Sequence, residues 1–545
     1  MENEKIENLL NVSLSVDEST RQRSDILSVG YSKEEKTWEL IIRYINNLDE
    51  VYALSNEIEV FELLGNFAIL KTPQSLVERI ALLPSVIFVE MPKRLNFAID
   101  RVKSDICVNF SLNETTNLTG KGVWIGIVDS GLDINHPAFR NRDGSSKVFR
   151  FLDQTDGNRE YTKEELNQVL KPLESTGHGT AVAGIATSMA PESELLIVKL
   201  GYPDSDNFPR TTQLMAGVDY LIRKSLEFNK PIAINISFGM NYGSHSGQSL
   251  LENYLNTVSN LGQCAICVGS GNEGASPIHS MITVNQLGVS YENEFTVSMY
   301  QSNLNLQIWK YYTDDARISL RHPSGEEISL DTTGRYNLGS VTILVFLGSP
   351  KPYSQWQEIF LDFIPNEDYI DSGIWSISIT PTKIVRGIYQ LWLPTASSLN
   401  VGTGFVRPTP EHTLTIPSTA ESVITVGAYD TFRETYATFS GRGPISFLNL
   451  GKPELVAPGV NIRTAAVGGG YETVSGTSFA TPFVTGACAL LMQWGIVNGN
   501  DRFLYGQKLK AYLLKGAKPL TGYTQYPNNT IGWGKLCVRD SLPKF

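Results

Sequence analysis

Residues 475–482 of this 545-residue chain read Ser-Gly-Thr-Ser-Phe-Ala-Thr-Pro and lead directly into an apolar run. That run, residues 483–494, predicts a helix that begins close to Ser478. The first N–H groups of a helix lack partners within it, and the positive end of the helix dipole lies there. A serine at that point presents its hydroxyl where developing negative charge is stabilised. Ser478 is therefore a candidate nucleophile.

Two blocks upstream supply the residues that such a serine needs. Residues 123–131 read Val-Trp-Ile-Gly-Ile-Val-Asp-Ser-Gly and place Asp129 at the end of an apolar strand. Residues 177–184 read Gly-His-Gly-Thr-Ala-Val-Ala-Gly and place His178 at the start of a helix of small residues. Alone, either block is more often a turn or a backbone constraint. A serine hydroxyl becomes an effective nucleophile when a neutral imidazole accepts its proton and a carboxylate orients the imidazole. Together the three blocks predict that Asp129, His178 and Ser478 form a catalytic triad.

The order Asp, His, Ser along the chain is that of the subtilisin triad, and the chain resembles the subtilisin-like serine proteases (subtilases). Residues 264–274 read as a buried strand followed by a glycine-rich loop. They resemble the segment that carries the oxyanion-hole asparagine, here Asn272. The resemblance also implies that Ser237, Phe238 and Gly239 pair with the substrate backbone and wall the first specificity pocket. The alternatives are a turn asparagine and an ordinary strand end.

Length, charge and hydropathy bound the remaining possibilities. A chain of 545 residues is expected to form two or three domains. The formal net charge of −11, without any basic run, predicts that the protein binds no nucleic acid. The polar N-terminus lacks the pattern of a secretory signal peptide, and no run of about 20 apolar residues predicts a membrane span.

The cysteines and histidines predict neither disulfides nor a metal site. Five cysteines, an odd number, argue against a disulfide framework, and Cys264 and Cys267 lie inside an apolar strand, which predicts buried thiols. The histidines show no metal-binding spacing. Many subtilases bind a structural calcium through a carboxylate just after a His-Pro pair. Here that position is Ala138, and the usual ligand loop after Ser188 is missing. A hard cation needs about 6–8 oxygen ligands, so we expect no metal and no cofactor.

The pattern of apolar residues changes along the chain. Residues 1–36 are polar and predict a loosely ordered leader. Residues 37–91 predict a small α+β domain that resembles the subtilase propeptide, so residues 1–97 are assigned to a propeptide, an intramolecular chaperone and inhibitor. An unrelated N-terminal domain is the alternative. Residues 98–274 alternate short apolar strands with helices, which is typical of a parallel sheet. Active sites of such sheets lie at the carboxyl ends of the strands.

Residues 277–411 interrupt this alternation with strands and almost no helical periodicity, which predicts an inserted all-β domain, a sandwich or barrel. The catalytic domain therefore spans residues 98–545 around the insertion. The predicted fold class is α/β: a subtilisin-like parallel sheet flanked by helices, with an N-terminal α+β propeptide domain and an inserted all-β domain. A propeptide, a complete triad and this insertion resemble the Csp subtilases of spore-forming clostridia, in which the insertion is called the jump-start domain.

The resemblance implies a serine endopeptidase that cleaves its own propeptide near residues 94–98. It would then activate a spore cortex-lytic hydrolase zymogen by limited proteolysis during germination. The expected partners are the cleaved propeptide, held non-covalently, and that protein substrate; no membrane span and no nucleic acid are expected. The implied location is the cortex or coat region of the spore, and otherwise the cytoplasm.

The insertion contains no Ser, His or Asp motif, so we expect it to rigidify the catalytic domain rather than to supply catalytic groups. Csp relatives include pseudoproteases, so a non-catalytic germination scaffold or sensor is one alternative. A general intracellular subtilase is another. The complete triad favours an active enzyme.

Overall fold

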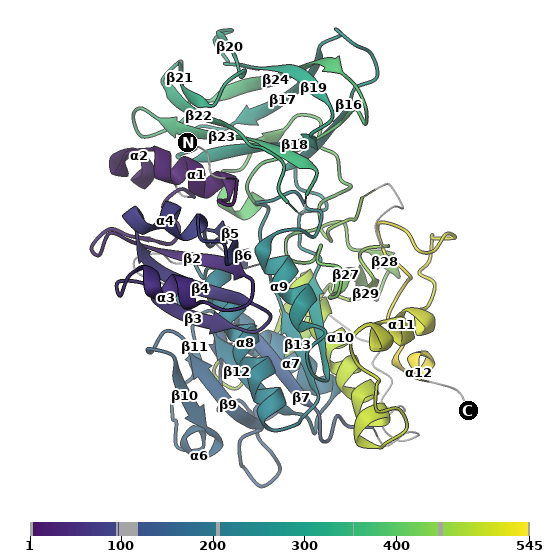
Figure 1. The fold of residues 1–545 in the computed structure, drawn as a ribbon. Helices are drawn as coiled ribbons and strands as arrows, with labels where there is room; N and C mark the ends of the chain where they lie inside the picture. The colour runs from purple at the N-terminus through teal and green to yellow at the C-terminus, as the bar shows by residue number, and fades with distance from the viewer. Residues whose placement is uncertain are drawn as a thin grey trace. The chain divides into compact units, whose positions relative to one another are not determined.

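The computed structural model describes residues 4–24, 26–93, 96–97, 118–202, 208–352, 354–444 and 451–542. Its helices and strands form two compact units, whose elements are labelled in Figure 1. The first unit comprises Met1–Arg94, Met240–Leu250 and Ala275–Pro410, and the second comprises Leu95–Gly239, Leu251–Gly274 and Glu411–Phe545.

The second unit is built on a nine-stranded sheet in the order β10-β9-β12-β7-β13-β15-β27-β28, with β29 also paired to β27. The central strands run parallel, while β10 and β28 are antiparallel to their neighbours. The central strands are short, fully buried apolar runs, as expected for a parallel sheet covered on both faces. The bounds are β7 Trp124–Asp129, β9 Val148–Asp153, β10 Arg159–Thr162, β12 Glu194–Lys199, β13 Ile232–Ile236, β15 Cys264–Gly269, β27 Ile424–Asp430, β28 Thr435–Tyr436 and β29 Leu455–Pro458.

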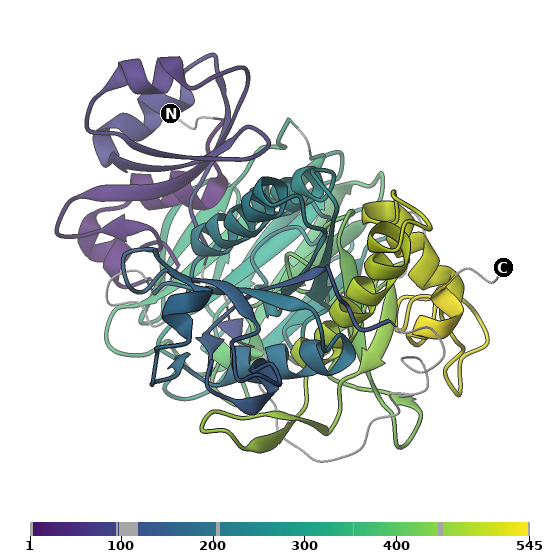
Figure 2. The same cartoon turned by 90° about the horizontal axis from the view of Figure 1, so that it is seen from below.

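Helix α10, Thr477–Met492, is buried along its whole length and packs against β13, β15, β27 and the helix α7. With its extension to Val497 it is long and apolar enough to cross a membrane, but 83% of its apolar window is buried inside the protein, which is typical of a core helix. Figure 2 shows the C-terminal helices α11 and α12, in yellow, beside α10. The other helices of this unit are α6 Lys163–Leu166, α7 His178–Met189, α8 Thr211–Glu227, α9 Leu250–Val258, α11 Gly506–Gly516 and α12 Val538–Ser541, with a 3₁₀ turn at Pro137–Phe139.

Short strands complete the second unit and hold its loops in place. They form three two-stranded ladders, in which β11 pairs with β8, β14 with β6, and β30 with β31. The bounds are β6 Asn96–Phe97, β8 Gly131–Leu132, β11 Leu173–Glu174, β14 Phe238–Gly239, β30 Ile462–Ala465 and β31 Tyr471–Val474.

The N-terminal part of the first unit is an antiparallel sheet in the order β1-β2-β4-β3, with β5 paired to β2 and helices packed on it. The bounds are α1 Asn8–Ser15, α2 Glu18–Gln22, β1 Tyr31–Ser32, β2 Thr37–Tyr44, α3 Asp49–Leu54, β3 Glu59–Leu63, β4 Phe67–Pro73, α4 Gln74–Ala81 and β5 Val86–Glu90.

The expectation of a loosely ordered leader over residues 1–36 is wrong for the residues that the structure describes. Ile6, Leu9 and Leu10 are fully buried in the core of this part. The Arg21 guanidinium is also buried and lies over the ring of Trp38. Helix α1 has only eight residues, so its few apolar positions do not stand out from the polar residues around them.

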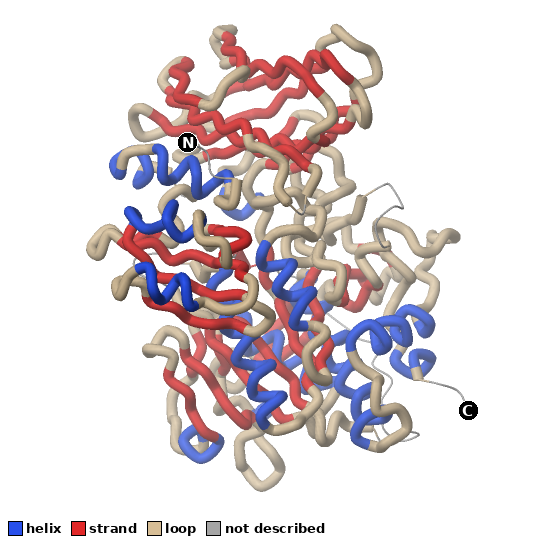
Figure 3. Tube along the Cα trace, viewed as in Figure 1, coloured by secondary structure: helices blue, strands red, loops and turns tan. Residues whose placement is uncertain are grey.

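The regular structure of the insertion is almost all strand, drawn red at the top of Figure 3. They form two antiparallel sheets, ordered β16-β25-β18-β23-β22-β21 and β20-β19-β24-β17-β26. The sheets share one apolar core in which the rings of Phe295, Phe363 and Trp375 are in mutual contact. The bounds are β16 His279–Thr283, β17 Tyr291–Val297, β18 Leu304–Tyr311, β19 Asp315–Arg321, β20 Glu327–Ser329, β21 Gly334–Leu338, β22 Val341–Leu347, β23 Trp356–Pro365, β24 Gly373–Lys383, β25 Ile388–Trp392 and β26 Gly404–Phe405.

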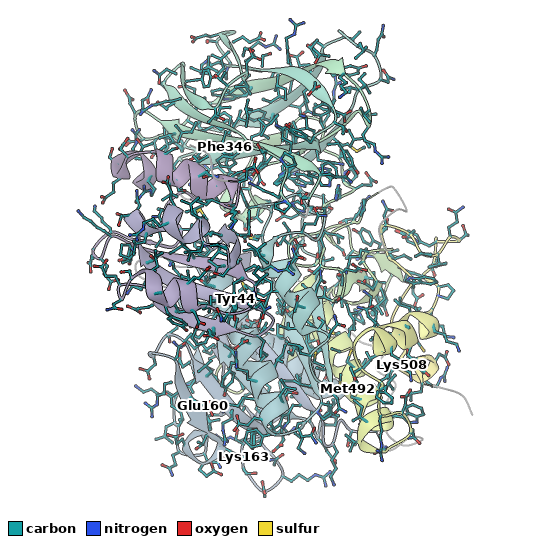
Figure 4. All side chains as sticks on the ribbon, viewed as in Figure 1. Tyr44, Glu160, Lys163, Phe346, Met492 and Lys508 are labelled. Atoms are coloured by element: carbon teal, nitrogen blue, oxygen red, sulfur yellow. The ribbon has the colours of Figure 1, made fainter. Side chains whose placement is uncertain are left out.

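The insertion also completes the core of the N-terminal part. Strand β23 is buried on both faces: Ile359, Leu361 and Phe363 point into the insertion's own core, while Phe360 and Ile364 join the core that contains α1 and β2. Leu344 and Phe346 of β22 belong to the same N-terminal core (Phe346 is labelled in Figure 4). The two parts of the first unit therefore share buried apolar side chains, which the sequence did not predict.

Candidate active site

Asp129 and His178 meet at the carboxyl end of strand β7. Asp129 is the last residue of β7, and His178 is the first residue of helix α7. The helix can begin there because Gly177 adopts a left-handed conformation, with φ of 89°, that glycine tolerates without strain. His178 Nδ1 donates to Asp129 Oδ1 at 2.8 Å, and both side chains are buried. This bond fixes the imidazole so that Nε2 is the nitrogen left to act as a base.

The charge around His178 favours the imidazolium. Burial by itself would lower the pKa of His178, but the Asp129 carboxylate and the more distant Glu174 and Glu472 outweigh it, so the pKa is raised above its usual value of 6.5. An imidazole that holds a proton more readily is a stronger base toward a serine hydroxyl.

Ser478 is the second residue of α10 and is almost fully buried. Gly476 precedes the helix with φ of 150° and ψ of 160°, a conformation essentially restricted to glycine, and so fixes where the helix begins. The Ser478 hydroxyl donates to the Ser237 carbonyl at 3.3 Å, and the ring of the adjacent Phe479 lies 5.3 Å from the His178 ring. Proton transfer to His178 therefore requires the hydroxyl to turn toward Nε2, as is common before a substrate binds.

Asn272 lies in the loop after β15, at the start of α10. Its Oδ1 accepts hydrogen bonds from the Thr477 backbone N–H at 3.0 Å and from the Thr477 hydroxyl at 3.1 Å. Because the oxygen is held in this way, the amide group Nδ2 is the donor that Asn272 can offer to a ligand. The Asn272 side chain therefore connects the loop after β15 to the start of α10.

The segment Ser237–Phe238–Gly239 follows β13 and runs beside the start of α10. The Ser237 hydroxyl donates to the Ser478 carbonyl at 3.1 Å. Phe238–Gly239 forms strand β14, which pairs antiparallel with Asn96–Phe97 (β6) in the register Phe238↔Phe97 and Gly239↔Asn96. A Cβ at Gly239 would lie 2.3 Å from Thr415 Oγ1, so only glycine fits this edge. The segment thus holds an extended stretch of the same chain by backbone pairing.

Ala138 stands at the position expected to have lost a calcium ligand, and its backbone makes a local hydrogen bond. The Ala138 N–H donates to His136 Nδ1 at 3.1 Å. The nearby Asp133 carboxylate accepts the backbone N–H groups of Asn135 and Gly468. Within the described residues no group of three or more His, Cys, Asp or Glu side chains is placed to hold a metal ion.

Sequence reasoning missed one polar residue beside the candidate triad. Glu174 lies on β11, four residues before His178, and its carboxylate binds Ser130 and the first turn of α7. The signal in the sequence is an acidic residue shortly before a helix N-terminus, where negative charge is favourable. That signal is too common to single out Glu174 without the structure.

The parallel sheet, with an aspartate at a strand end and a histidine and a serine at helix starts, is the architecture of an α/β serine hydrolase. The chain belongs to the subtilase family, because the model described as "Subtilase family" matches residues 120–337 and 397–534. A second model, described as "Csp protease B prodomain", matches residues 4–93. The gap between the two subtilase matches lies within the insertion.

Three relatives show how far the similarity extends. The solved structure of the Clostridium perfringens CspB protease is 35% identical, with a TM-score of 0.74, and the match covers 79% of this chain and 94% of that one. The minor extracellular protease Vpr of Bacillus subtilis is 24% identical over 78% of this chain and 52% of its own length. Fervidolysin from Fervidobacterium pennivorans is 15% identical with a TM-score of 0.50, covering 94% of this chain and 62% of that one, which shows the fold alone. The chain thus spans about half the length of Vpr.

Proposed function

We propose that the protein is a serine endopeptidase with Asp129, His178 and Ser478 as its catalytic triad. The observation that carries the proposal is the 2.8 Å hydrogen bond from His178 to Asp129, next to the start of α10, where the Phe479 ring adjacent to Ser478 contacts the His178 ring. The runner-up, a non-catalytic germination scaffold or sensor, needs no such oriented base. A general intracellular subtilase would use the same site.

In the proposed reaction, Ser478 Oγ attacks the scissile carbonyl carbon while its proton passes to His178 Nε2. Asp129 stabilises the imidazolium that forms. The carbonyl oxygen becomes an oxyanion that accepts hydrogen bonds from Asn272 Nδ2 and the Ser478 backbone N–H. The imidazolium then gives its proton to the leaving amine as the C–N bond breaks. Water attacks the acyl-enzyme by the same route and restores Ser478.

We further propose that the first substrate is the chain itself. The backbone pairing of Asn96–Phe97 with Phe238–Gly239 supports this, because a peptide substrate would be bound by the same antiparallel pairing. The paired segment Phe238–Gly239 directly follows Ser237, whose carbonyl accepts the Ser478 hydroxyl. The proposed cleavage is therefore near Phe97, within the expected range of residues 94–98.

The test is the intact mass of protein made in a protease-free host. Wild type is expected as two fragments that divide within residues 94–98, and Ser478→Ala as one chain. A fluorophosphonate probe, which reacts with activated serines, should label only wild type. Unlabelled, uncleaved wild type would favour the scaffold or sensor. Cleavage of Ser478→Ala at the same bond would contradict autoprocessing. The triad would still be tested separately, by whether the probe labels wild type.

The cleaved propeptide is expected to stay bound. Four insertion side chains, Leu344, Phe346, Phe360 and Ile364, share a core with the N-terminal residues. Polar contacts join the same two parts: Asn8 donates to Glu358 at 2.8 Å, and Lys351 donates to Asn8 at 2.7 Å. These contacts do not depend on the bond that would be cut. Co-elution of both fragments in gel filtration is the expected result.

For the physiological substrate we propose a cortex-lytic hydrolase zymogen, with action in the cortex or coat region of a spore. This rests on the resemblance to Csp proteases. The assay mixes the wild-type protein with such a zymogen from the same organism and follows release of the zymogen's propeptide. Failure to cleave it, under conditions where a generic peptide is cleaved, would leave a protease with another substrate.

A further inference from the structure

The Glu174 side chain accepts five hydrogen bonds. It lies on β11, which pairs with β8 directly after Asp129 and Ser130. Its Oε1 accepts from the Ser130 hydroxyl at 2.5 Å and from the backbone N–H groups of Ser175 and Thr176 at 2.9 and 3.2 Å. Its Oε2 accepts from the Thr180 N–H and hydroxyl, both at 2.8 Å.

All five partners are donors to Glu174. A protonated carboxyl would have to donate from one oxygen, whereas an ionised carboxylate only accepts. These donors reach both oxygens of the Glu174 side chain. Thr180 is the third residue of α7, so the carboxylate also lies at a helix N-terminus, where the dipole favours negative charge.

Through these bonds Glu174 connects both members of the acid–base pair. Ser130, whose hydroxyl donates to Glu174, also contacts Asp129 Oδ1 at 3.3 Å and accepts the Gly179 N–H at 2.9 Å. Gly179 directly follows His178. One carboxylate thus fixes the residue after the aspartate and the first turn of the helix that carries the histidine.

We propose that Glu174 is a positioning residue of the active site, which acts through Ser130 and Thr180 to hold Asp129 and His178 in register. The proposal rests on the proposed peptidase activity only for its kinetic readout. Its second readout, the protonation of His178, needs no activity.

Three carboxylates favour the charged form of His178, and each comes from a different element: Asp129 from β7, Glu174 from β11 and Glu472 from β31. Asp129 makes the direct hydrogen bond, so it dominates. Removing the charge of Glu174 leaves that bond possible but weakens the preference for the imidazolium. The expected sign is a lower His178 pKa.

The first experiment measures the His178 pKa by NMR of histidine-labelled full-length protein in the Ser478→Ala background. Adding Glu174→Gln is expected to lower this pKa by about half a pH unit or more. The matched control is Glu165→Gln, which removes another carboxylate at a helix N-terminus, that of the α6 capping box. This control should leave the His178 pKa unchanged. A His178 pKa that Glu174→Gln does not move, whatever the melting temperature, would overturn the charge contribution.

The second experiment measures kcat/KM against pH with a neutral peptide substrate. Ser130→Ala keeps the Glu174 charge but removes the bridge, so kcat/KM should fall by up to about 100-fold with little change in the pH at which the acid limb bends. Glu174→Asp keeps the charge on a shorter side chain. Its kcat/KM should fall, while the pH at which the acid limb of the profile bends should stay the same. Unchanged kcat/KM in Ser130→Ala would contradict the positioning role. This variant tests that role even if Glu174→Gln does not fold.

Discussion

The Asn272 side-chain oxygen accepts the backbone N–H of Thr477 at 3.0 Å, and this bond ties the loop after β15 to the first residue of α10. The two elements are neighbours because α10 packs against β15. The orientation of the Asn272 amide group therefore depends on the same helix that carries Ser478. The candidate oxyanion donor and the candidate nucleophile are positioned as one unit.

Replacing Asn272 by alanine should lower kcat by about 100- to 1000-fold, because one of two oxyanion donors is lost, at a cost of about 3–4 kcal/mol in the transition state. KM should change little. Thr477→Ala keeps the backbone donor to Asn272 and removes only the hydroxyl donor, so its loss should be clearly smaller. Steady-state kinetics with a chromogenic peptide measure both. Equal losses in the two variants would argue against an oxyanion role for Asn272.

Because β23 is buried on both faces, single substitutions on it can separate two roles of the insertion: retaining the N-terminal fragment and stabilising its own fold. Phe360→Ala removes a ring from the core shared with the N-terminal part, and Phe363→Ala removes one from the insertion's own core. Each deletion should cost about 3–5 kcal/mol. Only Phe360→Ala should release the cleaved N-terminal fragment in gel filtration. Release by both variants would mean that retention depends on the folding of the insertion as a whole.

Strands and blocks with local signals could be predicted from the sequence. The apolar runs at residues 194–199, 232–236 and 341–347 form strands β12, β13 and β22. Cys264 and Cys267 are buried thiols, as their apolar strand indicated. These segments are continuous apolar runs, so burial and strand structure follow from the same residues.

Features that depend on distant residues could not be predicted. The role of Glu174 depends on hydrogen bonds from Ser130 and Thr180, and its contact with Ser130, 44 positions earlier, has no local signal in the sequence. The burial of α1 requires side chains such as Phe360, about 350 positions further along the chain. A helix of eight residues is marginal by itself and is stabilised by such tertiary packing.

Chelation should have little effect on stability. Ala138 supplies no carboxylate, and the Asp133 carboxylate already accepts two backbone N–H groups. A calcium ion present at 100 times its Kd would add about 2.7 kcal/mol of stability, so its removal would lower the melting temperature of a chain of this size by about 2–3 °C. Scanning calorimetry with and without EDTA decides this. A fall of that size would show that a cation site exists despite the missing ligand.

Glu7 makes the first unit sensitive to pH. Burial, with further contributions from Glu90 and Glu358, raises the pKa of Glu7 to about 8, although Lys93 donates to it at 2.8 Å. Burial by itself would lower the pKa of Lys93, but the Glu7 and Glu90 carboxylates raise it above its usual value. The cluster therefore contains three carboxylates around one buried ammonium.

The sign of the pH dependence follows from proton binding. A raised carboxyl pKa means that the folded state binds a proton more tightly than the unfolded state, whose pKa is near 4.5. The stabilisation is therefore complete below about pH 4.5 and is lost as the pH rises through about 8. Melting temperature and retention of the cleaved fragment should both fall between pH 5 and pH 8. Glu7→Gln, which cannot ionise, should flatten this slope. An equally steep slope in Glu7→Gln would assign the pH dependence to another group.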